Sequence, residues 1–176
     1  MCATNGVVLL CADLAEYHGG DVTLPLAAVD ALLQLKAAPH TLAVTDTSAV
    51  FRYDGMILVA SLLAHTWPDL SRLLADIGEQ SAVPDGLADA IKRVKPFCPN
   101  SEHAIIRLTA DGNVCTADGD SSGSQAGFTF AQDTSFDADW LLSVLTLATT
   151  IDFAKYPAAV PFAGDGVRGV IMGTRL

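Results

Sequence analysis

The sequence predicts an α+β protein in which helices cover one face of antiparallel sheets. Three observations lead to this class. A unit of one strand, one helix and several strands recurs three times along the 176 residues. Apolar residues follow a helical spacing within each expected helix. The dipeptides Asp54-Gly55 and Asp111-Gly112 are strong signals for tight turns between strands. Sheets with helices gathered on one face are typical of the α+β class.

The first copy of the unit begins at Asp21, with a short strand expected over residues 22–24. Pro25 fits a helix start, because its missing N–H costs nothing there. Apolar residues then recur with helical spacing, and Pro39 ends the helix. Three strands follow, at residues 41–45, 49–53 and 56–63, with Asp54-Gly55 between the last two.

The second copy contains a helix from about Asp85 to Phe97, with Pro96 near its end. Its apolar face is formed by Leu87, Ala90, Ile91 and Val94. Strands are expected at 103–108 and 113–117, joined by Asp111-Gly112. The glycine- and serine-rich stretch 119–125 is typical of a loop, and a further strand is expected at 127–131.

The third copy opens with Phe136, and Asp137 is placed to cap a helix that runs through Leu147. Strands are expected at 150–155, 160–162 and 168–174, with a break at residues 164–166. Repetition at this length is a specific architectural signal.

Composition limits the function classes. Hydrophobic residues make up 51% and charged residues 17%, which excludes a disordered chain. No long apolar run or basic leader is present, so a cytoplasmic protein without membrane contact is the expectation. The net charge of −10 is unfavourable for general nucleic-acid binding. Lys92, Arg93 and Lys95 still form a local basic cluster on the second helix, which could face DNA or be a solvated helix face.

Cysteine spacing and catalytic motifs point away from metal sites and enzymes. Cys2, Cys11, Cys98 and Cys115 lie far apart, so we expect reduced thiols, no cofactor and no metal; the nearest metal candidates are Cys98, His103 and Cys115. Residues 119–123 are close to the nucleophile motif of trypsin-like proteases. The spacing from His65 to Ser121 is too short for the two barrels of that family, so we expect no catalytic residues.

Three segments far apart in the chain carry a family resemblance. Residues 3–9 read Ala-Thr-Asn-Gly-Val-Val-Leu, residues 67–73 read Trp-Pro-Asp-Leu-Ser-Arg-Leu, and the chain ends in Met-Gly-Thr-Arg-Leu. Together, in this order, they resemble the bacterial DNA sliding clamp, the β subunit of DNA polymerase III. Weaker similarities at 87–94 and 136–141 extend the resemblance over the whole chain.

The resemblance implies a DNA-clamp fold built from βαβββ units and a non-enzymatic role in replication. It implies a partial clamp domain at residues 1–74 and a complete C-terminal clamp domain at 75–176, so the chain would be a short or truncated clamp. In the family these segments form a hydrophobic groove for short peptides of polymerases, clamp loaders and repair proteins. The matching groove residues here are Thr4, Gly6, Leu9, Pro68, Arg72, Leu73, Met172, Arg175 and Leu176.

Departures from the family motifs leave a second hypothesis open. Gly173 stands where the clamp motif has proline, which is expected to loosen the C-terminal tail. The first and third helices carry few basic residues, and a clamp ring holds DNA weakly through basic helices. The chain could therefore be a processivity factor that assembles as a homo-oligomer. Alternatively, it could be a decoy or regulator with the clamp fold, which associates with a full clamp and does not encircle DNA.

Overall fold

The computed structural model describes residues 1–13, 21–64, 69–70, 73–74, 80–99, 102–117 and 127–175. The chain divides into two compact units, which we call the larger unit (residues 1–14 and 70–176) and the smaller unit (residues 15–69). Both are built from antiparallel sheets and helices, which confirms the α+β class. Residues 1–14 belong to the larger unit, whereas the sequence-based division placed all of 1–74 in one domain.

The smaller unit contains α1 (Leu26–Gln34) and a sheet of β3 (Thr41–Val44), β4 (Ser48–Tyr53) and β5 (Met56–Ser61). Phe51 and Ala60 are buried on one sheet face, and Leu32 of α1 packs against them. Gly55 turns the chain between β4 and β5 with φ 72°. The strand expected at 22–24 is wrong: this segment is irregular, although the Thr23 carbonyl accepts a hydrogen bond from the Leu63 N–H at 2.9 Å.

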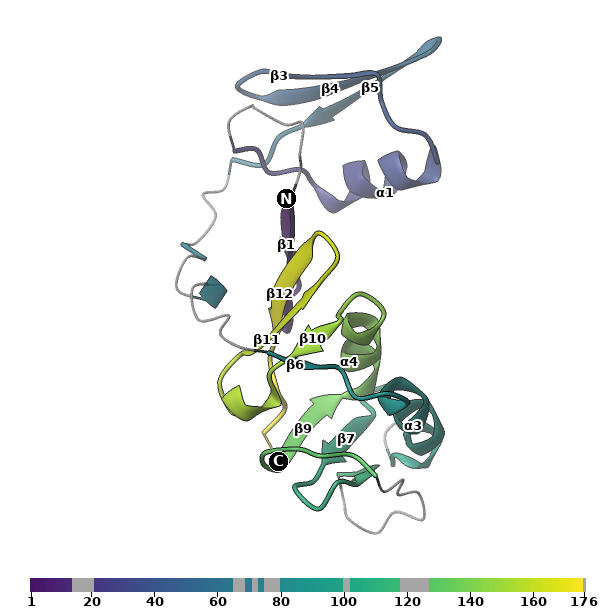
Figure 1. Cartoon of the computed structure of the whole chain (residues 1–176). Coiled ribbons are helices and arrows are strands. Elements are labelled where there is room, and N and C mark those ends of the chain that lie inside the picture. Colours follow the sequence, from purple (N-terminus) through teal and green to yellow (C-terminus); the bar gives the residue numbers. More distant parts are fainter. Residues whose placement is uncertain are drawn as a thin grey trace. The chain divides into compact units, whose positions relative to one another are not determined.

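The described residues of the larger unit form two sheets (Figure 1). The six-stranded sheet has the order β1 (Cys2–Thr4), β2 (Val8–Ala12), β12 (Val167–Ile171), β11 (Val160–Gly164), β10 (Thr150–Ile151), β6 (Ser81–Ala82). The three-stranded sheet has the order β8 (Val114–Thr116), β7 (Ile105–Leu108), β9 (Thr134–Asp137). All neighbouring strands in these two orders pair antiparallel.

Two helices of the larger unit pack against each other, α3 (Leu87–Val94) and α4 (Ala138–Leu145). α3 continues into the short 3₁₀ helix η1 (Lys95–Phe97), and its predicted apolar face is buried. Asp137 caps α4, because its Oδ1 accepts from the N–H groups of Asp139 at 2.9 Å and Trp140 at 3.3 Å. The cap predicted from the sequence is therefore confirmed.

Three strand predictions in the larger unit are wrong: one strand is absent and two end early. The strand expected at 168–174 is β12, which ends at Ile171. Residues 127–131 are not a strand; Phe128 donates to the Gly112 carbonyl at 3.3 Å, and Phe130 is buried. The strand expected at 150–155 ends at Ile151, and η2 (Phe153–Lys155) follows. There the Asp152 carboxylate accepts from the Ala154 N–H at 3.1 Å, a local bond that competes with the sheet ladder.

The core of the larger unit joins both sheets to both helices. Phe136 of β9 and Phe162 of β11 are fully buried, together with Leu87 of α3 and Leu141 of α4. Outside the core, Asp133 accepts from the Ala110 N–H at 2.8 Å. This bond, helped by the Arg107 guanidinium, holds the pKa of Asp133 below its ordinary value.

Candidate functional site

The two ends of the chain meet in the six-stranded sheet. β2 pairs with β12 so that Val8 lies opposite Ile171 and Leu9 opposite Val170. The pairing continues one step beyond the strand, because the Met172 N–H donates to the Val7 carbonyl at 2.8 Å. The first and last of the three segments singled out in the sequence are therefore neighbours in space.

A network of side-chain hydrogen bonds shapes the turn between β1 and β2. The Asn5 Oδ1 accepts from the N–H groups of Val7 at 2.9 Å and Val8 at 2.8 Å. The Thr4 hydroxyl donates to the Val8 carbonyl at 2.9 Å and accepts from the Gly6 N–H at 3.1 Å. Gly6 has φ +87°, which a side chain rarely adopts. The turn beside Met172 is thus fixed by its own residues.

The tail after β12 is anchored to β9 and to one aromatic ring. The Thr174 N–H donates to the Ser135 carbonyl at 2.8 Å, and the Tyr156 hydroxyl donates to the Thr174 carbonyl at 2.8 Å. A Cβ on Gly173 would lie 2.3 Å from the Tyr156 ring. The expectation that Gly173 loosens the tail is wrong, because this glycine lets the tail approach the ring closely.

The exposed residues of this region form a small mixed surface. Met172 is 42% exposed, and Thr4, Gly6 and Arg175 are exposed as well. Leu9 is only 5% exposed, so its side chain contributes little accessible surface. We call the turn 4–8 together with residues 172–175 the turn–tail site.

Of the other predicted groove residues, the structure describes only Leu73. Leu73 is 45% exposed, and its N–H donates to the Leu70 carbonyl at 3.0 Å. Pro68, Arg72 and Leu176 lie outside the described residues. The structure therefore brings together Thr4, Gly6, Leu9 and Met172, with Arg175 three residues further on. Their role in binding stays a prediction.

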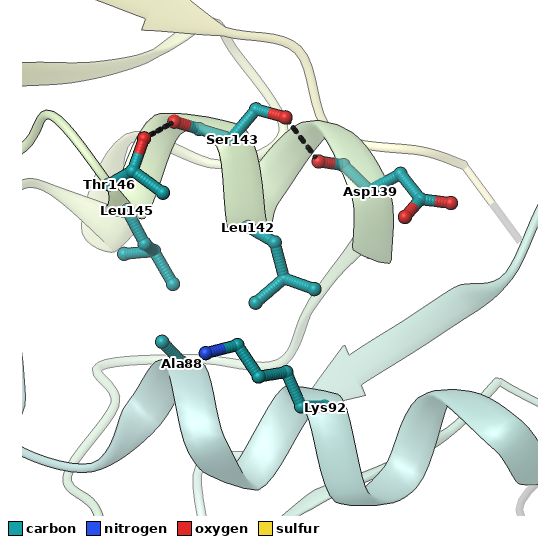
Figure 2. A pocket seen from close by; sticks show the side chains of 7 residues that line it. All are labelled: Ala88, Lys92, Asp139, Leu142, Ser143, Leu145 and Thr146. Carbon is teal, nitrogen blue, oxygen red and sulfur yellow. Dashed lines mark hydrogen bonds between the residues drawn. The ribbon is translucent and has the colours of Figure 1, made fainter.

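A hollow lies between α3 and α4, with a volume of about 260 Å³, and the described residues that line it are all outside the turn–tail site. Figure 2 shows Ala88 and Lys92 of α3 facing Leu142 and Leu145 of α4 across this hollow. Ser143 donates to the Asp139 carbonyl at 2.8 Å, and both residues line the hollow. Its walls are largely aliphatic, with an ammonium and a carboxylate among the lining groups.

Acidic residues accompany the basic cluster of α3. The Lys92 ammonium lies 3.5 Å from the Asp89 carboxylate, and the Lys95 ammonium contacts the Asp139 carboxylate at the start of α4. Lys92 and Arg93 are exposed, and Lys95 is half-buried. The basic cluster, for which the sequence allowed either a DNA-facing or a solvated position, is therefore partly neutralised by its own neighbours.

The remaining sequence candidates do not converge on a metal or catalytic site within the described ranges. Cys98 donates to the Ile105 carbonyl at 3.4 Å, Cys115 lies opposite Arg107, and His103 lies 3.6 Å from Asp137. Among the residues that the structure describes, no group of three His, Cys, Asp or Glu side chains could hold a metal. The protease-like stretch 119–123 and His65 lie outside these residues.

Three residues that anchor the turn–tail site were not predicted from the sequence: Asn5 within the site, and Ser135 and Tyr156, which contact it from outside. Only Asn5 carried a local signal, because Asn-Gly is a common turn dipeptide. Ser135 and Tyr156 reach the tail only because the sheet topology brings distant parts of the chain together.

Within the described ranges, no helix is long and apolar enough to cross a membrane.

Comparisons with known proteins identify the fold. No protein-family model matches the chain, and no curated protein sequence matches it significantly. Among solved structures, the chain is similar to the DNA polymerase III subunit beta sliding clamp of Bartonella birtlesii bound to griselimycin, with TM-score 0.80 and 20% identity over 99% of this chain and 54% of that one.

Two further clamp structures agree with this match. The Caulobacter crescentus polymerase III beta gives TM-score 0.79 and 19% identity over 99% of this chain and 53% of that chain. The Pseudomonas aeruginosa sliding clamp with ligand gives TM-score 0.79 and 18% identity over 99% and 54%. The chain therefore has the sliding-clamp fold and spans about half the length of these clamp chains.

Proposed function

We propose that this chain is a sliding-clamp-like binding module that captures short linear peptides of DNA polymerases, clamp loaders or repair proteins. The observation that carries the proposal is the turn–tail site. In a chain with the clamp fold, the two terminal segments that resemble the family's groove motifs lie side by side, held by the Met172–Val7 hydrogen bond. Neither segment carries a catalytic constellation, which favours a binding role over an enzymatic one.

The chemistry of the site suits an apolar peptide with a few polar contacts. Met172 offers a flexible, polarisable side chain that adapts to different apolar partners. The hydrogen bonds of the Thr4–Val8 turn and the Tyr156 anchor hold the backbone in place before a partner arrives. A preorganised surface loses less entropy on binding, so modest contact area can give useful affinity.

A labelled clamp-binding peptide is expected to bind the folded chain with micromolar affinity, corresponding to about −8 kcal/mol. Met172→Ala should weaken binding at least about tenfold, because it removes the main exposed apolar side chain of the site. Fluorescence anisotropy measures both affinities. Met56→Ala is the matched control, since Met56 of β5 is 39% exposed and lies in the smaller unit.

Two results would contradict the proposal. One is an absence of binding at hundreds of micromolar peptide while circular dichroism shows a folded chain. The other is an equal loss of affinity in Met56→Ala and Met172→Ala, which would place the peptide elsewhere or make the effect nonspecific.

The second candidate function is a clamp-fold regulator that does not encircle DNA. The partial neutralisation of the basic cluster on α3 favours it, because a ring that slides on DNA needs unopposed cations facing the phosphates. Under this alternative the chain binds clamp partners, or a full clamp, without raising polymerase processivity. A primer-extension assay on a long template separates the two functions, and light scattering reports whether the chain forms homo-oligomers.

Replacing both acidic partners is expected to strengthen duplex-DNA binding. In Asp89→Asn/Asp139→Asn the Lys92 and Lys95 ammonium groups lose their carboxylate partners, so the salt dependence of log K should steepen by about 2. A salt series of DNA titrations measures this slope. The control Asp111→Asn/Asp165→Asn makes the same charge change at exposed turn positions outside α3 and α4. Equal slopes in both variants would show that the pairs do not screen the cluster.

A further inference from the structure

Two of the four cysteines lie opposite each other on neighbouring strands. Cys2 of β1 is in register with Cys11 of β2, and no disulfide joins them in this structure. The other two have different neighbours: Cys98 donates to the Ile105 carbonyl, and Cys115 lies opposite Arg107. Because the four cysteines are widely spaced along the sequence, the sequence alone did not indicate that Cys2 and Cys11 would lie opposite each other.

The position of this pair in the sheet ladder determines how close the side chains come. Met1 and Ala12 exchange both hydrogen bonds, with Ala12 donating to Met1 at 2.7 Å and the Met1 nitrogen donating to Ala12 at 2.6 Å. Hydrogen-bonded and non-hydrogen-bonded pairs alternate along an antiparallel ladder, so Cys2–Cys11 is a non-hydrogen-bonded pair. Such pairs have Cα atoms about 4.5 Å apart, within the range that a disulfide spans.

We propose that Cys2 and Cys11 form a dithiol modification site, which a disulfide oxidant of the glutathione class converts to an intramolecular disulfide across the β1–β2 hairpin. The site shares a sheet face with Thr4 and Leu9, because Thr4 is opposite Leu9 two residues further along the ladder. The bond would tie the edge strand β1 covalently to β2 beside the turn–tail site. The proposal does not depend on peptide binding.

The reaction balances in two exchange steps. The Cys2 thiolate attacks one sulfur of oxidised glutathione, which forms a mixed disulfide and releases one glutathione. The Cys11 thiolate then attacks the Cys2 sulfur, closes the Cys2–Cys11 bond and releases the second glutathione. The two protein thiols lose two electrons to oxidised glutathione, and their two protons end on the two glutathione thiols.

The surroundings of the two thiols determine which one reacts first. Cys2 is half-buried, whereas Cys11 is only 6% exposed, so the oxidant reaches Cys2 first. Burial, together with the hydrogen bond to the Cys2 thiol, raises the pKa of Cys11 to about 11. The charges of the Met1 amino group and Arg168 oppose this rise only partly. Cys11 is therefore the slower, resolving thiol, because little of it is thiolate at neutral pH.

The position of the first tryptic cleavage site allows the oxidation state of Cys2 and Cys11 to be measured in one peptide. Lys36 is the first lysine or arginine in the chain, so trypsin releases residues 1–36 as one peptide that contains Cys2 and Cys11 and no other cysteine. The full-length protein is incubated in glutathione buffers of increasing oxidised fraction, quenched in acid, alkylated with N-ethylmaleimide under denaturing conditions and digested. Mass spectrometry then distinguishes two forms of the peptide. The open form carries two alkyl groups, whereas the disulfide-closed form carries none and has two hydrogens fewer than the free dithiol.

The folded protein is expected to give the closed peptide at an oxidised fraction at least about tenfold lower than the same protein in urea, because the sheet holds the two thiols together. The variant Cys98→Ser/Cys115→Ser should form the Cys2–Cys11 disulfide equally well. In the variant Cys2→Ser, Cys11 should remain a thiol that N-ethylmaleimide alkylates. Three results would overturn the proposal. They are a peptide that stops at one glutathione adduct, a disulfide-linked dimer of two chains, and closure no easier in the folded protein than in urea.

In the closed form, β1 should open less often. Amide hydrogen exchange in residues 2–4 is expected to slow by about tenfold on oxidation, with no change in β7 or β8. Unchanged exchange in β1 of a fully closed sample would show that the bond does not constrain the edge strand.

Discussion

Gly169→Val is expected to separate β12 from β2 and to lower the free energy of unfolding by about 3 kcal/mol. A Cβ at this position would lie 2.1 Å from the Leu9 carbonyl oxygen and 2.7 Å from the Phe162 ring. The first neighbour is backbone within the sheet ladder and cannot rotate away. Since the β2–β12 pairing creates the turn–tail site, peptide binding should be lost together with stability.

Urea unfolding followed by circular dichroism measures the first effect, and the peptide titration measures the second. The control is Arg168→Val, which places the same side chain on the adjacent, exposed position of β12. If Gly169→Val unfolds at the same urea concentration as Arg168→Val, the close approach of β2 and β12 is wrong.

Phe136→Ala is expected to cost about 3–5 kcal/mol, because it removes a large, fully buried side chain from the core of the larger unit. The Phe136 ring packs edge-on against Phe153 at 5.8 Å and Tyr156 at 6.1 Å between ring centroids. Tyr156 also anchors the tail, so the truncation should weaken the Thr174 contact as well.

Phe97→Ala provides a matched comparison for this prediction. Phe97 lies in η1 and is 58% exposed, so the same substitution should change stability by less than about 0.5 kcal/mol. Thermal unfolding of both variants tests the difference. Similar melting temperatures for the two would mean that Phe136 is not a central core residue.

Local signals in the sequence predicted most helices and hairpins correctly. Asp137 caps α4, and Gly55 and Gly112 occupy turns with positive φ, because each of these features depends on a few adjacent residues. The short strands β6 and β9 were missed, since their pairing partners are distant in the chain. Residues 127–131 look strand-like in sequence, yet core burial of Phe130 outweighs sheet pairing there.

The candidate site was predictable only through the family resemblance. Val7 and Met172 lie near opposite ends of the chain, and no local sequence pattern around either residue indicates that their backbones are hydrogen-bonded. The roles of Tyr156 and Gly173 are likewise determined by packing between segments, which composition and periodicity do not specify. The register of Cys2 with Cys11 has the same origin.

The most direct test of the central claim is to map the bound peptide by NMR on the full-length chain. The proposed function predicts that the largest amide shifts fall on the turn–tail site, at Gly6, Val7, Met172 and Thr174, and that amides of α3 and α4 change little. Shifts concentrated around the hollow lined by Ala88 and Leu142, with the turn–tail amides unmoved, would contradict it.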